Sequence, residues 1–316
     1  MKVIGVYGNY TKLKQIAKSL NLKAREIKLY KSINKITRYE ENTIPVIWVP
    51  QTKNKEDGVI NIHGEQGLFA FNNSGCINNP KVKDRLIQDI NKASTLGYKE
   101  VILDAFRYPS PHDQVMFLSC FCKYCTSKQP KLHKIRLKLK EAIKKKQPKT
   151  FLQALQELME TRTTLVKEQL TEVHEIAEKQ DIKLHTALFP PTLSKLVGQD
   201  YKTFKKHVKQ IQVMLYHKCS GPACLNHEIA SLIKLLRKLE LDTRTILQEL
   251  NIPAINPETL EQQGTPINMV VRELEKAITY NENKIIPIFW ANSKLQEIIN
   301  KAKQETSINK IILFIP

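Results

Sequence analysis

Four cysteines are spaced so that their thiols could hold one metal ion. Cys120, Cys122 and Cys125 stand within the run C-F-C-K-Y-C, and Cys76 lies further upstream. Zn²⁺ lowers the pKa of a thiol, so such cysteines bind as thiolates, and four of them complete a tetrahedral site with no open position. The pattern predicts a structural zinc ion, and the alternative is a set of buried free thiols.

Two further cysteines form a separate pair. Cys219 and Cys224 are five residues apart, with His217 and His227 nearby. These four side chains could bind a metal, but no other ligand pair with zinc spacing completes a second site. We therefore favour free thiols, or a pair that can oxidise, in a loop.

One carboxylate is placed as a catalytic group would be. Asp104 ends the apolar run V-I-L-D, and Arg107 follows three residues later. A carboxylate at the end of a buried strand is costly unless it is paired or functional. Arg107 is expected to hold Asp104 ionised by lowering its pKa. Two interpretations stay open: an ion pair that braces the fold, or a carboxylate that points into a pocket.

Short apolar runs alternate with helical periodicity along the whole chain, which predicts an α/β protein with a parallel sheet. The length of 316 residues suits a (β/α)8 TIM-barrel-like fold, which takes roughly 250 residues. We expect one such domain over residues 1–316, with extra or irregular strands, because ten strand candidates compete for eight places. They are Val3–Tyr7, Glu26–Tyr30, Pro45–Val49, Leu68–Phe71, Val101–Phe106, Ile182–Phe189, Ile211–His217, Thr243–Leu247, Ile285–Trp290 and Ile311–Ile315. Helices are expected at Leu13–Leu20, Val82–Leu96, Lys131–Lys146, Phe151–Glu178, Glu228–Leu239, Asn268–Tyr280 and Ser293–Lys303.

A long irregular stretch, residues 108–130, follows the strand that ends near Asp104. In a barrel this loop lies on the C-terminal face, where active sites form. The zinc ion would pin it to the loop that contains Cys76. The next segment, Lys131–Lys149, carries nine basic residues around an apolar helical stripe. We expect a solvated helix face there, with a polyanion-binding helix as the alternative.

The net charge of +19 also has two interpretations. It fits nucleic acid or another polyanion as a partner, or a lysine-rich surface like that of proteins from heat-loving organisms, which we favour because no nucleic-acid-binding motif is present. No signal peptide or membrane-length apolar run is visible, so a cytoplasmic protein without a membrane partner is expected. Motifs for nucleotide binding, α/β-hydrolases and zinc proteases are missing from the sequence.

A series of short motifs resembles a known group of proteins. In chain order, L-D-A-F-R-Y-P, A-L-F-P-P, G-Q-D-Y, M-L-Y-H and T-I-L-Q are similar to the motifs of uncharacterised glycoside-hydrolase-like TIM barrels, over roughly residues 67–290. The cysteine arrangement resembles the four-Cys zinc cluster of glycoside hydrolase family 42 β-galactosidases. The resemblance implies that Asp104 and Arg107 form the D-x-x-R pair. It also implies that Gly198, Gln199 and Asp200 form the G-Q-D motif.

The resemblance leaves the second carboxylate open. Glycoside cleavage ordinarily uses two carboxylates, but Ala187 stands where many relatives carry an aspartate. Glu249 is the next candidate because it follows Gln248 at an expected strand end, although its parity is wrong if Gln248 points inward. For Glu228 a place at a helix N-terminus is expected, and for Asp200 a capping role.

The function expected from these residues is hydrolysis of a glycosidic bond, with Asp104 and Glu249 as catalytic groups and a structural Zn²⁺. Arg107, Tyr108, His185, Tyr216, His217, Gln248 and Trp290 would line the substrate site. Two alternatives remain: a carbohydrate-binding or scaffolding barrel that has lost one carboxylate, and a polyanion-binding protein.

Overall fold

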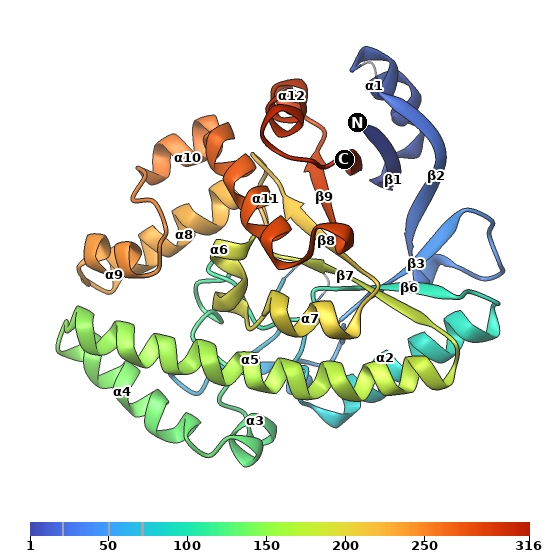
Figure 1. The fold of residues 1–316 in the computed structure, drawn as a ribbon. Helices are drawn as coiled ribbons and strands as arrows, with labels where there is room; N and C mark the ends of the chain where they lie inside the picture. The colour runs from blue at the N-terminus through green and yellow to red at the C-terminus, as the bar shows by residue number, and fades with distance from the viewer. Residues whose placement is uncertain (21, 50, 71–72) are drawn as a thin grey trace.

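Eight parallel strands close into a barrel in the order β1-β10-β9-β8-β7-β6-β3-β2 (Figure 1). The computed structural model describes residues 1–20, 22–49, 51–70 and 73–316. The barrel strands are β1 (Lys2–Gly8), β2 (Lys23–Ser32), β3 (Thr43–Trp48), β6 (Glu100–Asp104), β7 (Lys183–Leu188), β8 (Gln210–Leu215), β9 (Ile285–Trp290) and β10 (Lys310–Ile315). A short antiparallel pair, β4 (Val59–Ile60) and β5 (Gln66–Gly67), lies in the long connection between β3 and β6. The predicted TIM-barrel architecture is confirmed.

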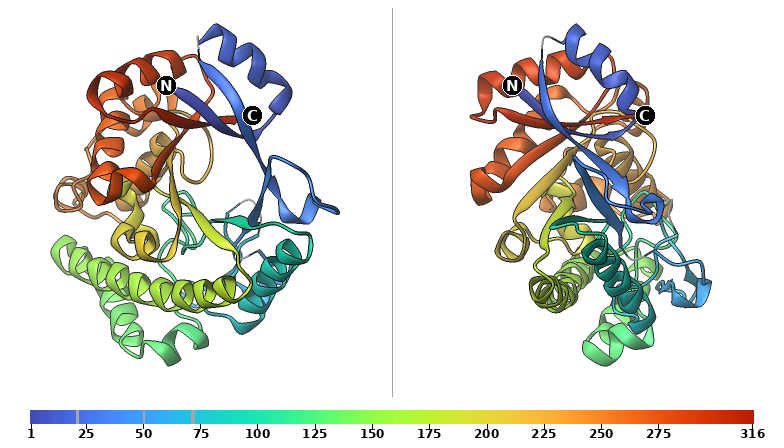
Figure 2. Two further views of the ribbon diagram at one scale, coloured as in Figure 1. Left: turned by 45° about the vertical axis from the view of Figure 1, so that its right-hand side comes forward. Right: turned by 90° about the vertical axis from the view of Figure 1, so that its right-hand side faces the viewer.

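Helices surround the barrel (Figures 1 and 2). They are α1 (Leu13–Ser19), α2 (Pro80–Thr95), α3 (Lys123–Lys128), α4 (Leu132–Lys144), α5 (Pro148–Lys179), α6 (Pro191–Ser194), α7 (Tyr201–His207), α8 (Leu225–Lys238), α9 (Thr243–Glu249), α10 (Pro257–Gln263), α11 (Ile267–Asn281) and α12 (Leu295–Glu305). None of those described is long and apolar enough to cross a membrane.

Local sequence explains where the helices begin and which face they bury. Asn79 caps α2 by accepting the backbone N–H of Lys81, and Pro80 occupies the first helical position, where no N–H is needed. On the basic helix α4 the expected apolar stripe is buried against α5 at Leu132, Ile135 and Leu139. Its lysines lie on the outer face.

Two of the ten expected strands are not barrel strands. Thr243–Leu247 is helical and belongs to α9, because Asp242 accepts the backbone N–H groups of Arg244 and Thr245 and so starts a helix. The candidate Leu68–Phe71 ends on a residue outside the described set, and over residues 68–70 the chain forms only an isolated bridge from Phe69 to Ser74.

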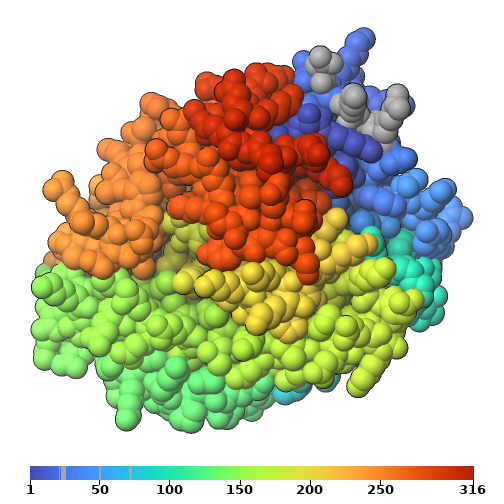
Figure 3. All heavy atoms as spheres, viewed as in Figure 1, coloured from blue at the N-terminus to red at the C-terminus, as the bar shows by residue number. Residues whose placement is uncertain are grey.

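The barrel is closed by the two ends of the chain. β1 pairs with β10 in register from Lys2–Lys310 to Gly8–Ile315, with one shift near Val3. In the space-filling view the first and last segments, blue and red, lie against one another (Figure 3). Strand ends at the same rim therefore come from both termini of the sequence.

Candidate functional site at the mouth of the barrel

Five aromatic side chains form a rim at the C-terminal ends of the strands. We call Tyr7, Tyr30, Tyr216, Trp290 and Phe314 the aromatic rim. Trp290 stacks on Phe314 with ring centroids 4.5 Å apart, and Tyr7 stacks on Tyr30 at the same distance. Tyr216 meets the Trp290 ring edge-on at 5.4 Å. Trp290 and Phe314 are half-buried, so part of each ring can meet a ligand.

The orientation of this rim follows from a contact across the barrel. The Tyr7 hydroxyl on β1 donates to Gln212 Oε1 on β8 at 2.6 Å. Because β10 and β9 separate β1 from β8 around the barrel, this bond crosses the interior. Tyr7 therefore points inward, and Tyr30 and Phe314, which are its register partners on the neighbouring strands, share its face.

Asp104 lies at the end of β6, and its charge acts on two tyrosines of the aromatic rim. Its charge raises the pKa of both Tyr7 and Tyr216, after burial, which is the larger cause for each. Burial raises the pKa of Asp104 itself to about 6, and the N–H of Ala105, 2.7 Å from Oδ1, only partly offsets that effect. The side chain is nonetheless not fully enclosed. It is therefore a largely buried carboxyl group that can hold a proton at mildly acidic pH.

Arg107 lowers the pKa of Asp104 as expected, but the two side chains do not form an ion pair. Burial raises that pKa by more than the guanidinium lowers it. Arg107 itself donates to the carbonyl of Tyr108 at 2.9 Å and lies over the ring of Phe189, 4.7 Å from its centre. Among its acidic neighbours Glu228 affects its pKa most, ahead of Asp104. Arg107 is thus a buried structural residue in the loop after β6.

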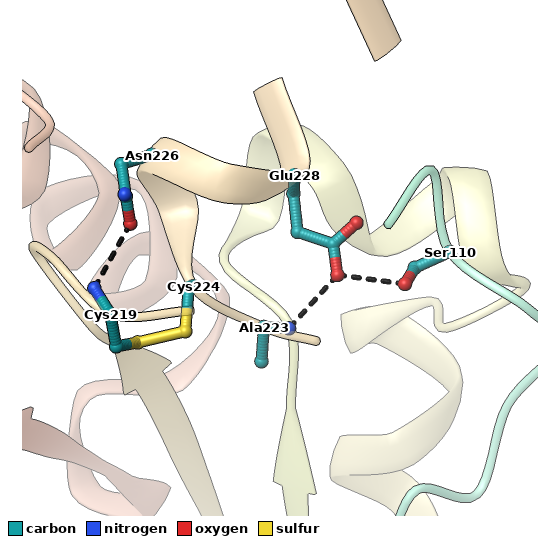
Figure 4. The surroundings of a disulfide bond; sticks show 6 residues. All are labelled: Ser110, Cys219, Ala223, Cys224, Asn226 and Glu228. Atoms are coloured by element: carbon teal, nitrogen blue, oxygen red, sulfur yellow. Dashed lines mark hydrogen bonds between the residues drawn. A yellow bond between two sulfur atoms is a disulfide. The ribbon is translucent and has the colours of Figure 1, made fainter. Parts of the chain in front are cut away.

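Glu228 joins two loops above the barrel. It lies in the first turn of α8, where helix-dipole stabilisation was expected, but its carboxylate is completely buried. Oε1 accepts the hydroxyl of Ser110 at 2.7 Å and the N–H of Ala223 at 2.9 Å, and Oε2 accepts the N–H of His112 at 2.9 Å. Figure 4 shows how the carboxylate spans the gap between the loop after β6 and the loop after β8. Glu228 therefore fixes both loops beside the mouth.

Replacing this carboxylate by an amide should measurably destabilise the protein. In Glu228→Gln an NH2 group faces one of the N–H or O–H donors, and Arg107 loses a buried counter-charge. We expect the free energy of unfolding to fall by about 1–3 kcal/mol, measured by denaturant titration. Glu297→Gln, which removes an exposed ion pair on α12, is the matched control and should cost under about 1 kcal/mol. Equal effects of the two changes would contradict the role given to Glu228.

Cys219 and Cys224 are joined by a disulfide in the loop after β8. This agrees with a pair that oxidises and leaves no thiol for a metal. Asn226 supports the loop by accepting the N–H of Cys219 (Figure 4).

Several predicted site residues lie elsewhere. His185 was expected near the mouth, but it contacts Gln210 at 3.0 Å and Glu100 at 3.7 Å, the first residues of β8 and β6, so it lies at the opposite end of the barrel. Gln248 and Glu249 were expected at a strand end, but they are exposed on α9. The structure therefore does not place Glu249 beside Asp104.

The G-Q-D residues build the loop after β7. Gly198 adopts a left-handed conformation with φ +81°, and a Cβ there would lie 3.0 Å from Arg162. Gln199 accepts the N–H of Phe189 and donates to the carbonyl of Phe106, tying β7 to β6. Asp200 caps α7, as expected.

The four clustered cysteines do converge. The sulfur atoms of Cys76, Cys120, Cys122 and Cys125 lie within 4.8 Å of one another, and all four residues are buried. Cys76 Sγ is 3.4 Å from Cys125 Sγ and 3.6 Å from Cys122 Sγ. A tetrahedron of sulfurs at about 2.3 Å from zinc has edges of roughly 3.8 Å. The donor set therefore fits a four-coordinate metal ion with little adjustment.

Polar groups of the second layer also suit a metal–thiolate centre. The N–H of Ile60 lies 3.4 Å from Cys120 Sγ, and the hydroxyl of Tyr108 lies 3.4 Å from Cys125 Sγ. Tyr108, which was expected to touch substrate, is thus buried beside the cysteines and also accepts from Asn78. The guanidinium of the buried Arg162 donates to the carbonyls of Phe117, Ser119 and Leu196. Its positive charge would partly balance the thiolates of a metal-bound cluster.

Most of the aromatic rim was not predicted from the sequence, and neither was Arg162, which donates to three backbone carbonyls. Tyr7, Tyr30 and Phe314 each lie near the end of a predicted strand, and that position was the available signal. Nothing local distinguishes them from core aromatics, because their neighbours come from strands far away in sequence.

Comparison of the sequence with known protein families gives no match, and comparison with curated proteins gives none either. Among solved structures, the chain is similar to the glycoside hydrolase domain of PgaB (BpsB) from Bordetella bronchiseptica, with a TM-score of 0.53 and 11% identity over 98% of this chain and 93% of that one. A β-galactosidase from Bacillus circulans sp. alkalophilus matches with a TM-score of 0.38 and 13% identity, over 76% of this chain and 43% of that one, which is too loose to carry an argument. The chain thus has a barrel fold of the kind found in a glycoside hydrolase.

Proposed function

We propose that this barrel binds a carbohydrate at its mouth and cleaves a glycosidic bond there, with Asp104 as the proton donor. The observation that carries the proposal is the combination of a strand-end carboxyl group, whose pKa burial raises to about 6, with a cluster of aromatic rings at the same end of the barrel. An acid of this pKa is protonated in a useful fraction at mildly acidic pH and can protonate a leaving oxygen.

The aromatic rim supplies the matching binding surface. Phe314 covers one face of the Trp290 ring, and because Trp290 is partly exposed, the exposed part of its ring is the surface on which a sugar would stack. Burial raises the pKa of Tyr216, so its hydroxyl stays neutral and can donate to a sugar oxygen. Glu228 fixes the loop that follows Asp104 through Ser110 and His112, and its charge acts on the buried guanidinium of Arg107.

A second candidate function is carbohydrate binding without cleavage. The groups that shift the pKa of Asp104 are Ala105 and Arg107, and no other acid of the described chain is among them. Ala187, on β7, also offers no carboxylate. Hydrolysis ordinarily needs a second group to activate water or attack the sugar. This observation favours a binding barrel, so turnover and binding must be measured separately.

A panel of oligosaccharides, tested for both binding and cleavage, distinguishes the two candidate functions. We expect binding by calorimetry and release of new reducing ends by chromatography. Trp290→Ala should weaken binding by roughly two- to tenfold, since a stacked aromatic contact is worth about 0.5–1.5 kcal/mol, whereas Trp290→Phe should retain most of the affinity. Binding without new reducing ends would support the second candidate. If Trp290→Ala retains both binding and turnover, the aromatic rim is not part of the substrate site.

We also propose that the cysteine cluster holds a structural Zn²⁺. The four thiolates of Cys76, Cys120, Cys122 and Cys125 would fill all four positions, so the ion would have no catalytic role. When bound, it would cross-link the loop after β6 to the loop that contains Cys76, and the loop after β6 begins directly after Asp104.

A further inference from the structure

A hollow lined largely by polar residues lies among the loops that follow β8 and β9. We call it the β8–β9 hollow. Its volume is about 620 Å³, and its lining includes His217, Lys218, Asn226, Glu261, Asn292 and Lys294. His217 follows Tyr216 of the rim, and Asn292 comes two residues after Trp290. The hollow and the aromatic rim thus share the loops that follow β8 and β9, and the volume of the hollow suits a ligand group.

The hollow carries positive charge. Lys218 and Lys294 both lower the pKa of His217, after burial, so their ammonium groups act directly on the imidazole. Lys218 donates to the carbonyl of Gln262, which leaves its charge uncompensated. Lys294 pairs with Glu297 at 2.9 Å, but both side chains are more than half exposed, so the pair is weak.

The one acid in the lining is itself neutralised. Glu261 on α10 pairs with Lys234 on α8, and the two helices lie side by side (Figure 1). The two lysines of the hollow are thus not cancelled by it. With a net charge of +19 on the chain, an anionic ligand is attracted both at long range and locally.

His217 adds a buried polar atom that lacks a partner. Its side chain is 4% exposed, and within the described part of the chain nothing hydrogen-bonds to its Nδ1. Gly264 packs against the ring in a left-handed conformation, and a Cβ there would lie 2.7 Å from His217 Cε1. The backbone is therefore shaped to hold this imidazole in place. Buried polar atoms are normally satisfied, so His217, which lines the hollow, has a polar atom whose hydrogen bond remains to be made.

We propose that the β8–β9 hollow binds an anionic substituent of the sugar held on Trp290, so that the substrate is an acidic carbohydrate. The proposal rests on the proposed function and narrows its substrate class. Ammonium groups bind carboxylate, sulfate ester and phosphate alike. The shared chemistry is the negative charge, and the choice of probe separates its sources.

The test compares matched pairs of oligosaccharides. Oligogalacturonate is paired with its methyl ester, sulfated chondroitin oligosaccharide with its desulfated form, and a phosphorylated oligosaccharide with its dephosphorylated form. We expect the acidic member of at least one pair to bind tenfold or more tightly, by calorimetry at fixed salt. That pair identifies the anionic group. In the Lys218→Gln/Lys294→Gln double variant the preference should fall to about twofold or less, with affinity for the neutral member unchanged.

The control carries the same change in net charge elsewhere. Lys238→Gln/Lys303→Gln removes two exposed lysines of α8 and α12 and should keep the preference. Equal affinity for the members of every pair overturns the proposal, as does an equal loss of preference in the control variant. In either case the proposed function still holds if the protein binds oligosaccharides and Trp290→Ala weakens that binding. Failure to bind any member, acidic or neutral, overturns the proposed function itself.

Discussion

Asp104→Asn should lower turnover of a cleavable glycoside by about 10²–10⁴-fold while leaving its binding affinity within about threefold. The amide keeps the size of the carboxyl group but has no acidic proton to give, and general acid catalysis is worth a factor of that order. In the unmodified protein kcat/KM should fall as pH rises through about 6, because the carboxyl group then loses its proton. The measurement is a pH–rate profile with matched binding titrations.

The control for this change is Asp113→Asn, in the same loop and also partly buried. It lies beyond Asp104 in the chain and should leave turnover within a few-fold. A variant at Asp104 that retains full turnover would exclude it as the proton donor. Unaltered turnover at both positions would direct attention to an acid outside the aromatic rim.

Asp104→Asn should also stabilise the folded protein at high pH. The pKa of Asp104 is raised from 3.8 to about 6 in the folded state, so folding disfavours its ionised form. Stability contributed by the protonated form is present below pH 4 and is lost as pH rises through 6. At pH 8 Asp104→Asn should therefore raise the free energy of unfolding by up to about 3 kcal/mol, and at pH 4 the difference should be small. Denaturant titrations at the two pH values measure this, and a destabilised variant at pH 8 would contradict it.

Loss of the metal site should have the largest effect on stability. Cys125→Ser removes one of four ligands, and we expect the zinc content of the purified protein to fall from about one ion per chain to near zero. Since metal binding contributes directly to folding free energy, Tm should fall on the order of 10 °C. The loop at residues 108–130 should become the first site of proteolysis. Metal analysis, calorimetry and limited digestion measure these three results.

Cys219→Ser/Cys224→Ser is the matched control, because it removes two sulfurs that form a disulfide. It should leave the metal content unchanged. A protein purified without chelator that carries no stoichiometric metal would show that Cys76, Cys120, Cys122 and Cys125 are free thiols.

The barrel could be predicted from sequence because its strands are buried on both faces. Runs such as V-I-L in β6 and I-I-L-F-I in β10 are apolar at every position, which is typical of a parallel sheet covered by helices. The error at Thr243–Leu247 came from a short run in which β-branched residues outweighed the cap at Asp242. A run of five residues has too little periodicity to separate helix from strand.

The candidate site was only partly predictable. The convergence of the cysteines followed from their spacing, but the position of His185 did not. Its side chain does point inward from β7, yet the end of the barrel at which it lies depends on the register that pairs it with Ile102 of β6 and Gln210 of β8. The pKa of Asp104 depends on how completely neighbouring loops exclude water, and this is a property of the folded chain rather than of the residues beside it in sequence.

The pairing of β1 with β10 has a consequence for synthesis. Until residues 310–315 have left the ribosome, β1 and β9 each lack a neighbour, and the nascent sheet has two open edges with unpaired backbone groups. An interrupted chain that ends before Lys310 would present those edges to other molecules and would tend to aggregate. Addition of β10 thus pairs both open edges and closes the sheet into a barrel.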